Sequence, residues 1–205
     1  MTTSASSALR RSRWTASLPD TPADALAEHR DVLAQMESLL PAVESVAQAI
    51  VQAYTADRRV YTFGNGGSAA DSLHFAEELV ARFKRERRPL AAQSLAADPT
   101  ALTCIANDYE YDDVFARQVR AFVRSGDIAI GFTTSGRSPN VVRALEAARE
   151  ADAVTVVFGG GEGEPAASTA KYALIVPSSS TARVQEMHVL MLHMILEQVD
   201  MWAAS

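Results

Sequence analysis

Two side chains that could transfer a proton or hold a metal ion lie close together on one predicted helix. His74 and Glu78 stand four residues apart, so a helix places both on one face. An imidazole and a carboxylate at this spacing can bind a divalent metal ion, although a solvated histidine–glutamate pair is the commoner arrangement. The helix is predicted to start at the glycine-rich stretch Gly64–Ser68, which favours a functional role because such a loop lets a ligand approach the backbone.

A second segment, Gly131 to Asn140, has the composition of a phosphate-binding turn. The apolar residues 128–132 predict a buried strand, and Ser138 followed by Pro139 predicts the N-cap and first turn of a helix. A helix N-terminus offers unpaired N–H groups and a partial positive charge. Four hydroxyl side chains add further donors: Thr133, Thr134, Ser135 and Ser138. Without a lysine or a Walker pattern, the segment suits one phosphate on a small molecule better than a nucleotide; an ordinary strand-to-helix turn is the alternative.

The elements that would position these residues follow from the apolar pattern. Strands are predicted at 59–63, 90–95, 128–132, 154–158 and 172–176, and helices at 22–40, 41–56, 68–79, 99–106, 112–123, 139–151 and 182–202. This alternation predicts an α/β doubly wound parallel sheet, in which ligands bind beyond the carboxyl ends of the strands where the strand order reverses. If the strands at 59–63 and 128–132 are neighbours there, the two loops face one crevice.

Composition sets the class of protein. With 205 residues, 48% of them hydrophobic, we expect one soluble domain over residues 20–205 and a disordered arm over residues 1–19, which are rich in Ser, Thr and Ala. The net charge of −6 and the lack of an evident basic face argue against a nucleic-acid partner. No apolar run approaches the ~20 residues of a membrane span, and the N-terminal segment lacks the apolar core of a secretory signal. A cytoplasmic protein is therefore expected.

The lone cysteine, Cys104, excludes an internal disulfide and fits a reducing compartment. Because its neighbours include Leu102 and Ile105, we predict that its side chain is buried.

The last predicted helix is apolar nearly all round, which indicates either a subunit interface or a central core helix. The two helices before the first strand exceed what the sheet needs, so they are candidates for packing on another subunit. Four polar residues of the last helix need partners or a function: Gln185, Glu186, His188 and His193.

Five segments together resemble a known family. They are Gly64–Ser68, His74–Glu78, Ala106–Asp108, Thr133–Ser138 and Ala182–His188 with His193, in family order across roughly residues 25–200. The chain resembles a sugar-isomerase (SIS) domain of the phosphoheptose isomerase, or sedoheptulose 7-phosphate isomerase, family. The resemblance implies a five-stranded, flavodoxin-like three-layer sandwich, a homotetramer, and one divalent metal ion per subunit, usually Zn²⁺. It also implies isomerisation of sedoheptulose 7-phosphate to a D-glycero-heptose (manno-type) 7-phosphate through a metal-assisted enediol.

The same resemblance assigns roles to individual residues. Glu78 is implied to be the base and His193 the general acid, and the implied metal ligands are His74, Glu78, Gln185 and His193. The implied substrate contacts are Asn65, Gly66, Gly67, Ser68, Glu78, Arg82, Asn107, Asp108, Thr133, Thr134, Ser135, Ser138 and Gln185. Arg82 would act from an adjacent subunit; a solvated place in the basic run 82–85 is its alternative.

One spacing does not fit a simple metal site. Gln185 and His193 are eight residues apart, which is about 12 Å along a helix, whereas metal bonds are about 2.0–2.2 Å long. Either both side chains lean towards each other at full stretch or a neighbouring subunit supplies one of them. Both alternatives place the site at an interface.

Departures from the family pattern leave other functions open. Arg137 stands where the family has Asn, Thr133 where it has Ser, and the loop 158–165 differs from the family's Thr-Gly loop. Arg137 either adds charge to the phosphate site or points outward. One rival function is a non-catalytic SIS adaptor that binds a replication initiator, although that relative lacks the full metal set. The other is isomerisation of a different sugar phosphate.

Overall fold

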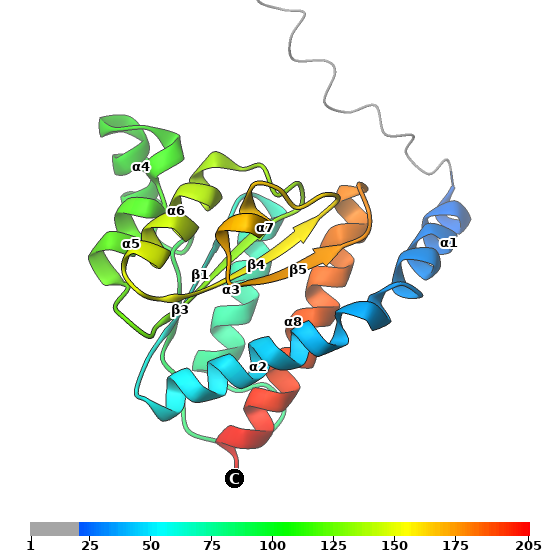
Figure 1. Ribbon diagram of the computed structural model, residues 1–205, viewed down its shortest axis with the longest axis horizontal. Helices are drawn as coiled ribbons and strands as arrows, with labels where there is room; N and C mark the ends of the chain where they lie inside the picture. Colours follow the sequence, from blue (N-terminus) through cyan, green and yellow to red (C-terminus); the bar gives the residue numbers. More distant parts are fainter. Residues whose placement is uncertain (1–20) are drawn as a thin grey trace, which may run out of the picture.

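A five-stranded parallel sheet forms the centre of the structure, a computed structural model that describes residues 21–205 (Figure 1). Its order is β2-β1-β3-β4-β5, and the strands are β1 (Val60–Gly64), β2 (Ala92–Ser94), β3 (Ile128–Thr133), β4 (Val154–Gly160) and β5 (Tyr172–Val176). The strand order reverses between β1 and β3, which pair in parallel from Val60↔Ile128 to Gly64↔Phe132. The predicted fold class is confirmed, and so is the prediction that these two strands are neighbours.

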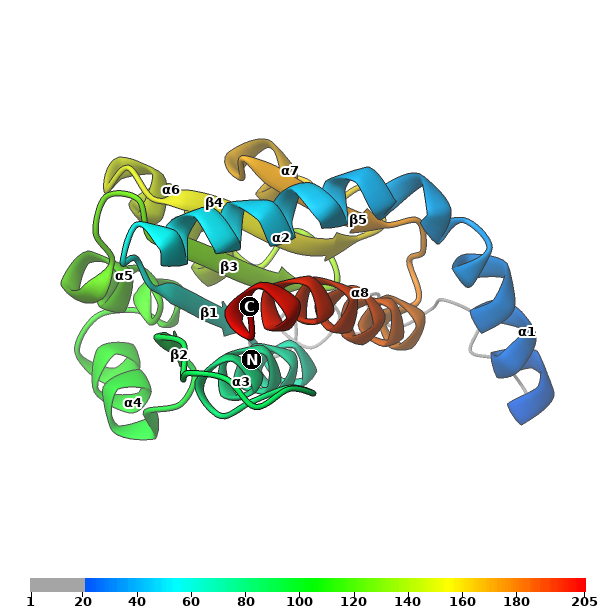
Figure 2. The ribbon, with the colours of Figure 1, turned by 90° about the horizontal axis from the view of Figure 1, so that it is seen from below.

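Helices cover both faces of the sheet. The helical elements are α1 (Pro22–Leu33), η1 (Met36–Leu39), α2 (Leu40–Thr55), α3 (Gly67–Val80), α4 (Pro99–Asp108), η2 (Tyr111–Asp113), α5 (Ala116–Phe122), α6 (Pro139–Glu150), α7 (Ala166–Thr169) and α8 (Thr181–Ala203). One hydrophobic core lies between the sheet and the helices α2, α3 and α8, which Figure 2 shows side by side. A second core lies between the other face and α5, α6 and α7. Because both faces are covered, the strands read in the sequence as continuous apolar runs.

The last helix, α8, is a core helix within this single chain. Its buried apolar residues pack against α2, α3 and the sheet: Val184, Met187, Met191, Leu192, Ile195, Leu196 and Val199. One of the polar residues singled out in the sequence, Glu186, has partners within the chain. Glu186 accepts a hydrogen bond from Arg183 and bonds to His29 of α1 at 2.7 Å. The apolar composition of α8 is therefore explained inside one chain, and a subunit interface stays a prediction.

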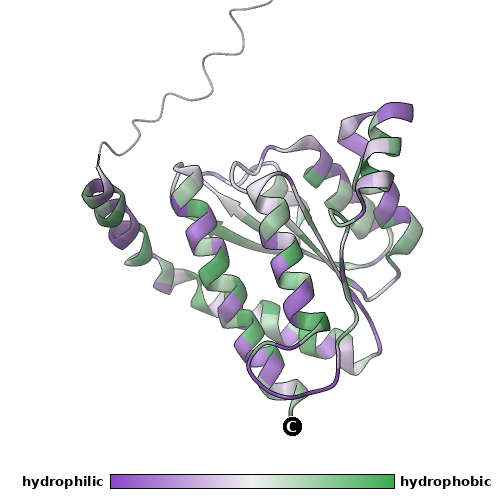
Figure 3. Ribbon diagram, turned by 180° about the vertical axis from the view of Figure 1, so that it is seen from behind, coloured by the Kyte–Doolittle hydropathy of each residue, from purple (hydrophilic) through white to green (hydrophobic). Residues whose placement is uncertain are grey.

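Helix α1 projects from the body of the molecule (Figures 1 and 2). Leu26, Leu33 and Leu40 are 52%, 41% and 41% exposed, respectively. Figure 3 shows hydrophobic residues on α1 and also along α3 and α8. Leu73 and Val80, both on α3, are exposed. None of the helices between residues 21 and 205 combines the length and apolar composition that crossing a membrane requires. The disorder predicted for residues 1–19 lies outside the described residues.

Several predicted boundaries were wrong. The helix predicted over 22–40 ends at Leu33, and a 3₁₀ turn separates it from α2, whose first turn holds Pro41, where the missing N–H leaves no hydrogen bond unmade. The helix predicted over 112–123 divides into η2 and α5, and α7 was not predicted. Cys104 is exposed rather than buried, because α4 lies at the edge of the molecule and has no fully buried residue.

Candidate active site

The loops after β1 and β3 are joined by a pair of asparagines. Asn65 Nδ2 donates to Asn140 Oδ1 and Asn140 Nδ2 donates to Asn65 Oδ1, both at 2.8 Å. The close approach of the two loops requires glycine at position 64, because a Cβ there would lie 2.6 Å from the Ser68 carbonyl oxygen and 2.9 Å from that of Phe132. The two loops therefore meet at the carboxyl edge of the sheet, which is the position predicted for the crevice.

The loop from Thr133 to Ser138 presents its hydroxyl groups beside a helix N-terminus. Thr133 Oγ1 and Ser138 Oγ lie 3.2 Å apart, and the Arg137 N–H donates to Ser135 Oγ at 3.2 Å. Ser138 is the N-cap of α6, as predicted, but its side chain makes no capping hydrogen bond. In the first turn, Pro139 has no N–H and the Val141 N–H donates to the Ser138 carbonyl at 3.1 Å. The Ser138 hydroxyl and the Asn140 N–H are thus the groups that can donate to an anion at the positive end of the helix.

The loop that follows β4 covers one side of this turn. A Cβ on Gly136, whose φ is +68°, would lie 2.2 Å from the carbonyl carbon of Gly163. Arg137 pairs with Glu162 across the same contact at 3.2 Å, and both side chains are exposed. The Arg137 guanidinium therefore points to the loop after β4. The hydroxyl groups of the turn, and not this guanidinium, remain as the donors for a phosphate.

Helix α3 starts at the other loop and meets α8 there. Gly66 has a φ of +57°, which favours glycine, and Ser68 is buried with its N–H donating to the Asn65 carbonyl. Gln185 of α8 contacts the first residue of α3, since a Cβ on Gly67 would lie 2.1 Å from Gln185 Nε2. Gly66, Gly67 and Gln185 thus lie beside Asn65 at the edge of the crevice.

A cluster of histidine and carboxylate side chains lies further along the same two helices. His74 Nε2 is 3.4 Å from Glu78 Oε1, and the rings of His74 and His193 meet edge to face with centroids 5.2 Å apart. The other face of His193 stacks on Phe83 at 5.6 Å. Burial, with a smaller effect of His74, lowers the pKa of His193 below its usual value. Glu77 is a further member, since single ligand atoms of His74, Glu77 and Glu78 lie within 4.8 Å of one another.

The four implied metal ligands do not all converge within one chain. Helices α3 and α8 run side by side in the same direction, with Gln185 beside Gly67 and His193 beside His74. Gly67 and His74 are seven residues apart, about 10 Å along α3. The structure therefore gathers His74, Glu78 and His193 and leaves Gln185 nearer the crevice.

Three other predicted site residues lie at the margins. Asn107 and Asp108 are exposed at the end of α4, where Asn107 Nδ2 donates to Asp108 Oδ1 at 2.8 Å. Arg82 follows the far end of α3 and lies 3.9 Å from Glu86. Within one chain, Arg82 is thus at the opposite end of α3 from the crevice.

A buried pair connects α3, α8 and β4. His188 Nε2 lies 3.1 Å from the Gly159 carbonyl oxygen, which can only accept, so this nitrogen carries the proton. Its Nδ1 faces Asp71 Oδ2 at 3.9 Å. Burial lowers the pKa of His188 to about 4 and raises that of Asp71 to about 6. Because the side chain of His188 is fully buried, we assign His188 a structural role.

Sequence reasoning missed Asn140, Tyr111 and Glu77. Asn140 stands in the first turn of a correctly predicted helix, so its proximity to the crevice could have been found. The Tyr111 hydroxyl donates to Asn65 Oδ1 at 2.9 Å from a segment without apolar periodicity, and no sequence signal points to it.

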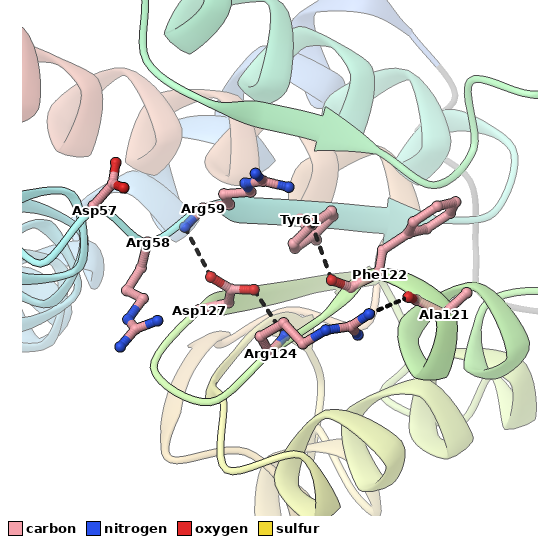
Figure 4. A pocket seen from close by; sticks show the side chains of 8 residues that line it. All are labelled: Asp57, Arg58, Arg59, Tyr61, Ala121, Phe122, Arg124 and Asp127. Atoms are coloured by element: carbon pink, nitrogen blue, oxygen red, sulfur yellow. Dashed lines mark hydrogen bonds between the residues drawn. The ribbon is translucent and has the colours of Figure 1, made fainter.

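A hollow of about 370 Å³ at the opposite edge of the sheet is a poor alternative site (Figure 4). Both oxygens of Asp127 accept backbone N–H groups, from Arg59 and Arg124, so this carboxylate holds the turn together. The guanidinium groups of Arg58, Arg59 and Arg124 point in different directions in Figure 4. They do not converge on a common ligand position.

The sheet order and the two ligand loops are those of a sugar-isomerase domain, and residues 26–160 match the SIS domain family. The phosphoheptose isomerase of Paramagnetospirillum magneticum is 45% identical over 180 residues, which cover 87% of this chain and 94% of the relative. That of Aquifex aeolicus is 46% identical over 168 residues, 82% of this chain and 88% of the relative. The solved phosphoheptose isomerase of Neisseria gonorrhoeae matches with a TM-score of 0.82 and 38% identity, covering 87% of this chain and 96% of that one.

The chain belongs to the phosphoheptose isomerase family and is an aldose–ketose isomerase. Because these relatives are enzymes, the comparison favours the enzyme over the non-catalytic adaptor.

Proposed function

We propose that this sugar-phosphate isomerase converts sedoheptulose 7-phosphate into a D-glycero-heptose (manno-type) 7-phosphate through an enediol, in the cytoplasm. The observation that carries the proposal is the cluster of His74, Glu78 and His193, which combines a carboxylate with two imidazoles. Aldose–ketose isomerisation requires a base for the proton between two adjacent carbons and an acid for the oxygens. This cluster offers both, and the turn of Thr133, Thr134, Ser135 and Ser138 offers the phosphate anchor.

In the proposed mechanism, Glu78 removes the proton next to the carbonyl and returns it to the adjacent carbon. His193 is held between His74 and Phe83, so its ring orientation is fixed. Its lowered pKa favours the neutral imidazole near neutral pH, which can still donate an N–H to a sugar oxygen. Asn65, Asn107, Asp108 and Gln185 are proposed to orient the sugar hydroxyls.

The donor set of the cluster suits a zinc ion. Imidazole nitrogen and carboxylate oxygen are common zinc ligands, and His74, Glu77 and Glu78 bring such atoms within 4.8 Å of one another. We propose His74, Glu78 and His193 as ligands, with Gln185 of the partner subunit as the fourth. A bound divalent ion would polarise the sugar carbonyl.

We expect the purified protein to carry about one divalent ion per chain, most of it zinc. Elemental analysis after purification without chelators measures this. His74→Ala should lose most of the metal, whereas His29→Ala, which changes a histidine on α1, should retain it. A metal-free protein that is fully active in strong chelator would contradict the proposed site.

The second expectation concerns assembly. Arg82 and the Thr133–Ser138 turn lie at opposite ends of α3, so one chain cannot bring both to one phosphate; we therefore propose a shared site in a homotetramer. Light scattering should give about four times the chain mass of 22.0 kDa, in a closed assembly. A fully active monomer would contradict the shared site.

The substrate itself is tested by NMR of the products. Sedoheptulose 7-phosphate should give an aldose signal in the presence of zinc, and ketose phosphates with five or six carbons should react more slowly. Faster conversion of a shorter ketose phosphate would favour the rival substrate. Neither turnover nor binding of any sugar phosphate would favour a non-catalytic protein.

A further inference from the structure

We propose that Tyr111 is a substrate-positioning residue that acts through Asn65, an inference that rests on the proposed function. The Tyr111 hydroxyl donates to Asn65 Oδ1 at 2.9 Å, although the two residues are 46 positions apart in the chain. Tyr111 is 58% exposed, so burial of its ring does not account for its position. Its hydroxyl instead joins the segment between α4 and α5 to Asn65 through a hydrogen bond.

The hydrogen bonds of Asn65 determine what it can offer a ligand. An asparagine side chain has two N–H donors and an oxygen with two acceptor sites. Asn65 Oδ1 accepts from both Tyr111 and Asn140, and one N–H of Asn65 is donated back to Asn140. One N–H is left. Asn65 can therefore donate to a substrate but has no remaining capacity to accept.

Tyr111 supplies the missing acceptor. Because its hydroxyl hydrogen is directed at Asn65, the lone pairs of its oxygen remain for another donor. A free N–H and a free oxygen on the two flanks of one amide match neighbouring hydroxyl groups of a polyol, because each hydroxyl can accept one hydrogen bond and donate another. The geometry therefore assigns Asn65 and Tyr111 jointly to the polyol part of the sugar phosphate, beside the turn that holds the phosphate.

Asn140, the buried partner of Asn65, should hold the loop in place when the Tyr111 hydroxyl is removed. Asn140 is 1% exposed, and its two hydrogen bonds with Asn65 persist when the Tyr111 hydroxyl is removed. Tyr111→Phe should consequently melt at the wild-type temperature. It removes one acceptor for the sugar and the hydrogen bond that orients the Asn65 amide.

Steady-state kinetics with sedoheptulose 7-phosphate test the inference. For Tyr111→Phe we expect KM to rise roughly 3- to 10-fold with a smaller change in kcat, the signature of a lost binding hydrogen bond. Inhibition by inorganic phosphate should keep its wild-type constant, because the phosphate turn is unchanged. The matched control is Tyr109→Phe, which removes a hydroxyl from a tyrosine that is 55% exposed and stacks on Arg117 at 3.7 Å. It should behave as wild type.

An unchanged KM in Tyr111→Phe, with an active wild type, would overturn this inference alone. Equal changes of KM in Tyr111→Phe and Tyr109→Phe would overturn it as well, and so would a changed inhibition constant for phosphate. In either case the rise in KM would have a cause other than the contact between Tyr111 and Asn65. A wild type that neither converts nor binds the substrate would overturn the proposed function, and this inference with it.

Discussion

Replacing Glu78 by glutamine is expected to lower turnover by at least ~100-fold, the usual contribution of a positioned proton-transfer group. Glutamine keeps the volume of the side chain but cannot accept the proton from carbon. Glu78 is half-buried on α3 and lies 3.4 Å from His74, a polar contact that a glutamine side chain can keep. The variant should stay folded, and it should still bind inorganic phosphate at the unchanged turn around Ser135 and Ser138.

Glu77 provides the matched control for this change. It precedes Glu78 in the same cluster but is exposed, so Glu77→Gln should lower turnover far less. Turnover is measured at saturating substrate with zinc added, alongside melting curves for both variants. If Glu77→Gln were the inactive variant, the cluster would still be the catalytic site, but the base would be Glu77 and not Glu78. If both variants kept wild-type turnover, neither carboxylate would be the base.

Removing the carboxylate of Asp200 is expected to cost about 3–5 kcal/mol of the free energy of unfolding, because it leaves a buried charge without its partner. Arg87 Nε lies 3.1 Å from Asp200 Oδ1, and both side chains are only 1% exposed. Arg87 also donates to the carbonyl oxygens of Glu78 and Leu79, while Asp200 accepts the N–H of Arg85 at 3.0 Å. This ion pair therefore connects α8 to the end of α3, the part of the helix that carries Glu78.

Urea unfolding of Asp200→Ala measures the effect. The control is Glu197→Ala, one turn earlier on α8, which removes an exposed, solvent-screened ion pair with Lys84 and should destabilise the protein far less. Equal destabilisation by the two changes would show that burial of the Arg87–Asp200 pair does not matter. A stable Asp200→Ala would show that Arg87 finds another partner or reaches water.

The fold was largely predictable because its signals are local. Every strand except the short β2 is a largely apolar run, and the glycine or hydroxyl-rich turns after residues 64 and 133 mark where the two ligand loops begin. The errors arose where tertiary contacts determine the burial of a side chain or the end of a helix. Cys104 has apolar neighbours in sequence, yet nothing packs over α4 on that side. The break after Leu33 was missed because the apolar stripe of the sequence continues across it through Met36 and Leu39.

The site was predictable in its residue types and less so in its geometry. The spacing of Gln185 and His193 correctly indicated that they lie far apart along α8, and the structure adds that His193 contacts His74 while Gln185 contacts Gly67. Tyr111 could not have been predicted. Its contact with Asn65 depends on the path of an irregular segment between α4 and α5, which no periodicity encodes.

The most direct test of the central claim is a ¹H NMR time course of sedoheptulose 7-phosphate with the zinc-loaded enzyme in D₂O. The proposed proton transfer by Glu78 predicts that an aldose anomeric signal grows in. It also predicts deuterium at the carbon next to the aldehyde, because the proton held by Glu78 exchanges with solvent before it is returned. Both changes should be at least ~100-fold slower with Glu78→Gln. A ketose spectrum that stays unchanged with the wild-type enzyme, or an equal rate with Glu78→Gln, would contradict the account.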